Sequence, residues 1–141
     1  MRGRPLDTAQ HEAAHVVVGV ALGLKLDCAE LGNPKDPHLA GSATFDVGKH
    51  HDTAWALTVA AGIAWERAAT GRRWPHAASG DARILRALVR GRHAREALIR
   101  AAAAMLTTLA PVHARVTRAL LERDLGPADI AALARGERHT A

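Results

Sequence analysis

Residues 11–15 read His-Glu-Ala-Ala-His and lie early in an amphipathic run from Asp7 to Leu24. In an α-helix, residues four positions apart lie nearly above one another, about 40° apart around the helix axis. His11 and His15 can therefore direct both imidazoles at one metal ion. Glu12 lies about 100° around the axis from His11, within reach of a water molecule on that metal. The motif therefore predicts a helix with a metal site on one face and Glu12 as general base.

The alternative interpretation is a fortuitous pair of histidines on a helix surface. Nine histidines and six glutamates would produce such a short motif by chance in roughly a few per cent of chains of this composition. The rest of the helix favours the metal site, because its second half is apolar nearly all round and is expected to be buried. That half comprises Val16, Val17, Val18, Val20, Ala21 and Leu22. Burial there would hold the motif rigidly while the first turn faces a cleft.

Composition favours closely packed helices in a single domain spanning residues 1–141. Apolar residues make up 48% of the sequence, much of it alanine, and aromatic residues only 3%. Such a composition is more typical of helices than of a β-sandwich. We therefore expect a mainly α (α+β) fold with a small antiparallel sheet, and a frayed tail over residues 135–141.

The order of elements follows from periodicity and turn residues. Alternating residues predict strands over residues 24–31 and 42–47, joined by a segment dense in glycine, proline and asparagine. Pro111 either kinks the longest predicted helix or starts a new one. The motif helix is expected to be capped by Asp7 and to end near Gly23. Four further helices are predicted: from Asp52 or Thr53 to about Gly71, from Ser79 to Gly91, from about His93 to Asp124, and from Ala128 to Ala134.

Two carboxylates are candidates to complete the metal site. Glu66 ends a strongly apolar run, so it is a metal ligand, a hydrogen-bond partner of a ligand, or a solvent-facing residue beside Arg67. Asp81 lies in the first turn of a predicted helix, where it either complements the helix dipole or supplies the third ligand. Spacing alone leaves both questions open. The adjacent His50 and His51 either lie in a solvated loop or line the cleft.

The charge of the chain gives weaker indications. Net charge is +5, with 16 arginines against 3 lysines. Arg83, Arg86 and Arg90 form one helical stripe, opposite Ile84, Leu85 and Leu88, and such a stripe is either solvated or binds an acidic partner. Neither a nucleic-acid-binding motif nor interleaved aromatic residues accompany it, so nucleic acid is not the expected partner.

Cysteine usage and hydropathy bear on the compartment. Cys28 is the only cysteine, so neither an intrachain disulfide nor a cysteine-based zinc cluster is expected. The first five residues contain no secretory apolar region. The longest apolar run, Ala54–Trp65, is too short to span a bilayer. We therefore expect a cytoplasmic protein with no membrane partner.

Several segments together resemble the peptidase domain of the FtsH-type ATP-dependent zinc metalloproteases. Residues 11–19 are similar to that family's H-E-A-G-H-A-hydrophobic-V pattern, and Gly62–Glu66 resembles its G-R-A-A-E helix, which a glycine at the position of Gly71 closes. Ser79-Gly80-Asp81, followed by Ile84 and Ala87, is similar to its N-D-hydrophobic segment. Residues 119–122, with Leu125 and Ile130 beyond, resemble its closing A-x-L-L-E motif and terminal helix. Ala14, Trp65 and Gly80 depart from the pattern.

The resemblance implies a zincin-like fold and a zinc metallopeptidase acting on peptides or unfolded proteins. It assigns Zn²⁺ to His11, His15 and Asp81, which leaves a fourth position for water. Glu66, on a helix expected to pack on the motif helix, is then expected to hydrogen-bond a ligand histidine. Neither an ATPase module nor a transmembrane segment precedes the motif, so we expect a stand-alone version whose partners are a separate ATPase or unfoldase, or further copies of the chain. The alternative is a non-catalytic zinc-binding scaffold or interaction module derived from the peptidase fold.

The oxyanion of peptide hydrolysis needs a stabilising group. The chain has no tyrosine, so a tyrosine hydroxyl is excluded from this role. The zinc must then stabilise the oxyanion, helped by a loop histidine such as His76.

Overall fold

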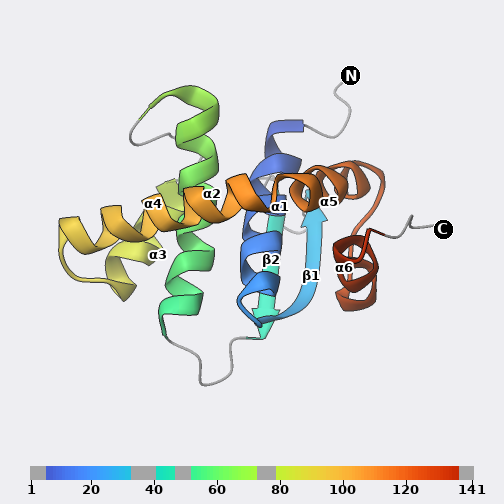
Figure 1. Cartoon of the computed structure of the whole chain (residues 1–141), viewed down its shortest axis with the longest axis horizontal. Coiled ribbons are helices and arrows are strands. Elements are labelled where there is room, and N and C mark those ends of the chain that lie inside the picture. The colour runs from blue at the N-terminus through green and yellow to red at the C-terminus, as the bar shows by residue number, and fades with distance from the viewer. Residues whose placement is uncertain (1–5, 33–40, 47–51, 73–78, 137–141) are drawn as a thin grey trace.

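The computed structural model describes residues 6–32, 41–46, 52–72 and 79–136. This part of the chain is mainly helical and contains one small antiparallel sheet, which confirms the predicted mainly α character. Figure 1 shows the arrangement. In chain order the elements are α1 (Leu6–Ala21), β1 (Lys25–Leu31), β2 (Gly41–Asp46), α2 (Thr53–Thr70), α3 (Ser79–Leu88), α4 (Arg92–Thr108), α5 (Ala110–Glu122) and α6 (Pro127–Ala134).

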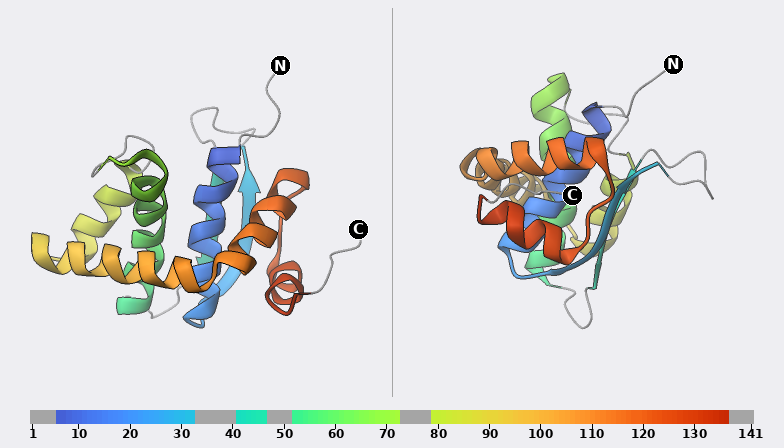
Figure 2. Two further views of the ribbon diagram at one scale, coloured as in Figure 1. Left: turned by 45° about the horizontal axis from the view of Figure 1, so that its top comes forward. Right: turned by 90° about the vertical axis from the view of Figure 1, so that its right-hand side faces the viewer.

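Helix α1 lies at the centre, with α2 on one side, the sheet on the other, and α5 packed across it (Figures 1 and 2). Because three elements cover its middle, every described side chain position from Ala9 to Gly19 except Gln10 is buried, and this stretch includes the whole motif. The expected burial of the second half is confirmed for Val16, Val17 and Val18, whereas Val20 and Leu22 are half-buried and Ala21 is exposed. The helix starts at Leu6, so Asp7 lies in its first turn rather than at the cap. Gly23 ends the turn after the helix with φ 87°.

The sheet contains an irregularity that the alternating pattern did not indicate. β1 pairs with β2 from Lys25 opposite Asp46 to Leu31 opposite Gly41, and the register shifts between Leu26 and Cys28. A bulge of this kind changes which side chains face inward. Leu26 and Ala29 are buried whereas Cys28 is half-buried, so the alternation of buried and exposed residues changes phase at the bulge. The predicted last residue of the second strand, residue 47, lies outside the described residues.

Helix α2 forms as predicted because both its ends carry local signals. The side chain of Asp52 accepts a hydrogen bond from the backbone N–H of Ala54 at 3.1 Å. Gly71 adopts a left-handed conformation with φ 70°, and its N–H bonds to the carbonyl of Arg67. Two hydrogen bonds of 2.7 and 3.0 Å from the Arg67 guanidinium to the Glu96 carboxylate link α2 to α4.

Pro111 starts a new helix rather than kinking a long one. α4 ends at Thr108, and α5 begins at Ala110 with Pro111 in its first turn, where the missing N–H costs no hydrogen bond. Of the two alternatives left open by the sequence, the structure therefore shows the second, a new helix that ends at Glu122. The bend lets α5 return to pack on α1. Among the described residues, no single helix is long and apolar enough to cross a membrane, and α4 with α5 meets that test only as a pair bent by 84°.

The C-terminal helix agrees with the sequence. α6 begins at Pro127 and ends at Ala134, and the Asp129 side chain accepts a hydrogen bond from the N–H of Gly126 at 2.9 Å. Leu125 joins this end of the chain to the sheet through two backbone hydrogen bonds of 2.8 Å with Ala29. Of the predicted tail, residues 137–141 lie outside the described residues.

Candidate metal centre

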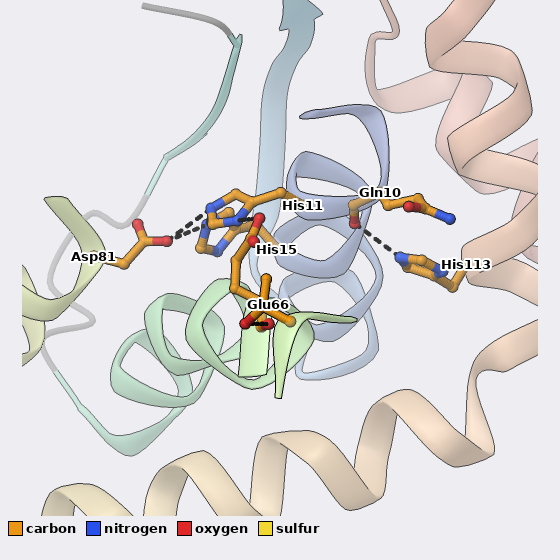
Figure 3. A network of polar contacts seen from close by, with 7 residues as sticks. Gln10, His11, His15, Glu66, Asp81 and His113 are labelled. Atoms are coloured by element: carbon orange, nitrogen blue, oxygen red, sulfur yellow. Dashed lines mark hydrogen bonds and ion pairs between the residues drawn. The ribbon is translucent and has the colours of Figure 1, made fainter. Parts of the chain in front are cut away.

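Three side chains that are distant in the sequence converge beside α1. Figure 3 shows His11 and His15, from successive turns of α1, facing Asp81 from the first turn of α3. His11 Nε2 lies 3.2 Å from His15 Nε2 and 2.8 Å from Asp81 Oδ2. His15 Nε2 lies 3.1 Å from the same carboxylate oxygen. Two imidazole nitrogens and one carboxylate oxygen therefore form a compact triangle.

This triangle has the dimensions of a metal site. In a tetrahedral zinc site with bonds of about 2.0–2.2 Å, neighbouring donor atoms lie roughly 3.3 Å apart. The three distances here, 2.8, 3.1 and 3.2 Å, are slightly shorter. Two imidazoles with one carboxylate are also a donor set of catalytic zinc sites. His11, His15 and Asp81 could therefore hold a metal ion, and their chemistry fits zinc.

The second ring nitrogen of each histidine, Nδ1, forms a hydrogen bond with a residue of α2. His11 Nδ1 donates to Glu66 Oε1 at 3.0 Å, and His15 Nδ1 donates to the carbonyl oxygen of Thr58 at 2.7 Å. Such hydrogen bonds fix the tautomer and the orientation of a metal-binding imidazole. In the neutral form of each ring, these bonds leave the lone pair of Nε2 directed at the cluster. Glu66 itself is buried in α2 and reaches the cluster only through His11.

Electrostatics make the cluster a site for positive charge. Burial alone would lower the pKa of His15, but the charge and hydrogen bond of Asp81 outweigh it and raise that pKa to about 9. Burial also opposes the charged form of His11. The hydrogen bond to Asp81 favours that form and contributes to a pKa of His11 that is raised overall. Burial would raise the pKa of Asp81, yet the two histidines hold it well below its usual range. In the metal-free protein, the cluster therefore favours positively charged imidazoles.

Glu12 lies in the same cleft as the cluster. Its side chain is buried, and burial raises its pKa although the two histidines act in the opposite direction. A Cβ atom added to Gly41 would lie 3.0 Å from Glu12 Cγ, so the start of β2 packs closely against this carboxylate. A carboxylate with a raised pKa is better suited to accept a proton near neutral pH.

The cleft has a volume of about 290 Å³ and joins four elements, because α1, β2, α2 and α3 all contribute to its lining. One part is polar and holds Glu12 and the cluster. The other part is an apolar wall of Ala43, Phe45, Trp55, Val59 and Ile84. The sequence pattern did not single out this wall, because its members come from elements whose packing it could not specify.

Two helical glycines make the close packing around the cluster feasible. A Cβ atom at Gly62 in α2 would lie 2.6 Å from both Nε2 and Cε1 of His15, and it would also meet the Asp81 carboxylate. A Cβ at Gly19 would lie 2.6 Å from the ring of Phe45. Glycine is disfavoured inside helices, so two glycines in apolar helical runs were a signal for close approach.

His113 is a further residue that the sequence analysis missed. It is buried in α5, its Nε2 donates to the carbonyl oxygen of Gln10 at 2.8 Å, and its ring lies 4.5 Å from that of Trp65. Burial lowers its pKa, only partly offset by this hydrogen bond. The contact ties α5 and α2 to the residue before His11, as Figure 3 shows for Gln10. A lone histidine on an apolar helix gave no specific signal.

The remaining predicted residues divide into two groups. His50, His51 and His76 lie outside the described residues. The arginines at positions 83, 86 and 90 are all exposed. Of the three apolar residues opposite them, Leu85 is buried, whereas Ile84 and Leu88 are exposed. Ile84 and Leu88 stay exposed because the neighbouring helix α2 covers only one flank of α3.

The site thus combines a convergent pair of imidazoles, an ionised carboxylate and a second carboxylate in one partly apolar cleft. These groups come from α1 and α3 and are oriented from α2. No model of a known protein family matches the chain, and no curated protein matches it either.

Proposed function

We propose that the protein is a zinc-dependent metalloendopeptidase that hydrolyses peptide bonds in peptides or unfolded proteins. The observation that carries this proposal is the convergence of His11, His15 and Asp81 in a cleft that also contains Glu12. A purely structural zinc site would need no additional carboxylate at this place. Two imidazoles and a carboxylate favour zinc over calcium or magnesium, which prefer all-oxygen sites.

Each residue has a defined task in this proposal. A zinc ion held by His11, His15 and Asp81 supplies a Lewis acid that lowers the pKa of water and polarises a carbonyl group. Glu12 accepts the proton of the attacking water and later passes it to the leaving amine. Glu66 keeps the His11 ring in its orientation through the 3.0 Å bond to Nδ1. The assistance predicted for His76 remains a prediction.

The shape of the cleft supports an extended substrate. Among the described strands, β2 is paired on one side only, with β1. Its residues Ser42 and Ala43 line the cleft, so a polypeptide could add there as a further strand and lie across the cluster. In a folded protein most extended segments are already paired within a sheet. Unfolded chains and peptides are therefore the proposed substrates.

The test separates metal binding from hydrolysis. We expect wild-type protein to bind about one zinc per chain and to digest an unfolded protein such as casein. Glu12→Gln should keep the zinc and lose at least about 100-fold in hydrolysis rate, because only the proton acceptor is removed. Glu122→Gln, the same change at an exposed position of α5, serves as the matched control and should hydrolyse like wild type.

Two outcomes would contradict the proposal. Equal rates for wild type and Glu12→Gln would show that Glu12 is not the base. Zinc binding by a wild-type chain that cleaves neither casein nor a peptide library would favour the alternative, a non-catalytic zinc scaffold.

A further inference from the structure

An apolar stripe on α3 leads away from the candidate metal centre. Ile84 and Leu88 are 43% and 37% exposed, and only Leu6 among the described large apolar side chains is more exposed. Both lie on the same flank of α3 as Asp81, at three and seven residues beyond it, whereas Leu85 faces the core. Exposed apolar side chains that continue from a cleft indicate a binding surface rather than part of the core.

The stripe connects two hollows. Ile84 lines the cleft together with Phe45 and Trp55. Leu88 lines a second groove of about 550 Å³, which lies between the start of α2, the end of α3 and the first half of α4. Most of the residues that line this second groove are apolar or small: Ala56, Val89, Ala94, Ala97 and Leu98, with Asp52 and Thr53 at the start of α2.

The spacing of the two hollows matches an extended polypeptide. Ile84 and Leu88 are four residues apart, which corresponds to about 6 Å along a helix axis. In an extended chain, side chains on the same face are two residues apart, or roughly 6.6 Å. One apolar side chain in the cleft at Ile84 would therefore place the side chain two residues away beside Leu88. The side chain between them would point in the opposite direction.

We infer that this protein selects polypeptide substrates with two apolar side chains separated by one residue, both on the same side of the bond that is cleaved. The first side chain occupies the cleft against Ile84, and the second occupies the groove against Leu88. The occupant is the substrate itself, because the stripe begins at the proposed metal ligand Asp81. This inference rests on the proposed function and specifies its substrate class.

Binding of labelled peptides to the Glu12→Gln protein tests the inference without turnover. One short serine-rich peptide contains Leu-Ser-Leu, and its partner has the second of these leucines replaced by serine. We expect fluorescence anisotropy to show about tenfold tighter binding of the two-leucine peptide, the effect of burying one more apolar side chain. Adding Leu88→Asp should abolish that preference.

A second pair of variants keeps the test valid if Leu88→Asp does not fold. Ala97→Arg introduces a long charged side chain at an exposed position of the second groove and should also abolish the preference. Ala103→Arg is the matched control, because it is an exposed alanine of the same helix about 120° around the axis from Ala97. It should retain the full preference, as should Leu6→Asp on α1.

The outcomes distinguish this inference from the proposed function. Equal affinities for the two peptides, or a preference that survives both Leu88→Asp and Ala97→Arg, would overturn the inference. A change of oligomeric state in those variants with no change in peptide preference would also overturn it, and would indicate that a second copy of the chain covers the groove. Selective peptide binding by a protein whose wild-type form cleaves no peptide would instead overturn the proposed function and the placement relative to a cleaved bond. The recognition of two apolar side chains separated by one residue would stand.

Discussion

In each histidine of the cluster, the two ring nitrogens have different partners. Nε2 faces the other donors, whereas Nδ1 is bound by Glu66 in one case and by the carbonyl of Thr58 in the other. Because a backbone carbonyl cannot be removed by substitution, Glu66 is the only one of the two orienting groups that mutation can change. Losing an orienting group and losing a metal ligand should have effects of different size.

The first prediction compares Asp81 with Glu66. Asp81→Ala should remove nearly all zinc binding, because it deletes one of three donor atoms. Glu66→Gln should weaken zinc binding only about 10- to 100-fold, since the amide oxygen can still accept a hydrogen bond from His11 Nδ1. Titration of both variants with zinc against a competing chelator measures the two affinities. The reverse order would make Glu66 the ligand and Asp81 a helix-dipole residue.

A second prediction at the residue scale concerns Gly62. In Gly62→Ala the new methyl group would overlap the His15 ring and the Asp81 carboxylate, so we expect a loss of zinc affinity of at least about 100-fold, as for a displaced ligand. Gly80→Ala is the control, because a Cβ there meets no atom within 4 Å and alanine favours the helix. Wild-type zinc affinity in Gly62→Ala would show that α2 does not approach the cluster this closely.

At the scale of elements, the sequence predicted what local residues determine. Asp52 caps the start of α2, Gly71 caps its end, and Pro127 begins α6. These signals act within one turn of the chain, so the sequence alone contains them. The bulge after Leu26 was missed, and at Pro111 the sequence left a kink and a new helix as alternatives. Both depend on what the elements pack against, since the bulge fits β1 around the core and the bend returns α5 to α1.

The residues of the candidate site also differ in whether the sequence could predict that they lie together. The spacing of His11, Glu12 and His15 lies within one helix, so the sequence alone could predict that these residues are neighbours. Asp81 meets His15 across 66 positions of sequence, and spacing carries no information over that distance. The family resemblance nominated Asp81, and the fold places it there. The apolar wall, in contrast, was not predicted, because Phe45, Trp55 and Ile84 belong to three separate elements.

The third prediction concerns the metal-free link between α1 and α3. The pKa of His15 is raised from 6.5 to about 9 in the folded chain. Its contribution to the free energy of unfolding is therefore complete below pH 6.5 and is lost as the pH rises through about 9. The contribution of Asp81, whose pKa is lowered from 3.8, is present above pH 3.8 and is lost as the pH falls through its folded pKa.

Urea unfolding of chelator-treated protein measures this effect. We expect a loss of roughly 1–3 kcal/mol between pH 6.5 and a pH above 9, and a clearly smaller loss in His15→Gln, which lacks the titrating group. Equal losses in both proteins would show that the pH dependence arises elsewhere in the chain.

At the scale of the whole molecule, the cluster links α3, which has few other contacts, to the central helix α1. α1 is enclosed by α2, α5 and the sheet, whereas α3 packs chiefly on α2 at one end of the molecule (Figures 1 and 2). Within the described residues, the link from α3 to α1 is made by the Asp81 carboxylate and the two imidazoles. A metal ion bound by these three side chains would replace that hydrogen-bonded link by coordination.

The last prediction follows from this linkage. Zinc should bind the folded chain far better than the unfolded one, because α1 and α3 meet only after folding. At a free zinc concentration of 100 times Kd, the stabilisation is about 2.7 kcal/mol. For a chain of this size we expect Tm to rise by roughly 10 °C. Differential scanning fluorimetry with buffered zinc measures the shift, and magnesium, which prefers oxygen ligands, should leave Tm unchanged.

Asp81→Ala should show almost no zinc-dependent rise. A full rise in that variant would mean that zinc stabilises the protein from other histidines among its nine, and not from the cluster between α1 and α3.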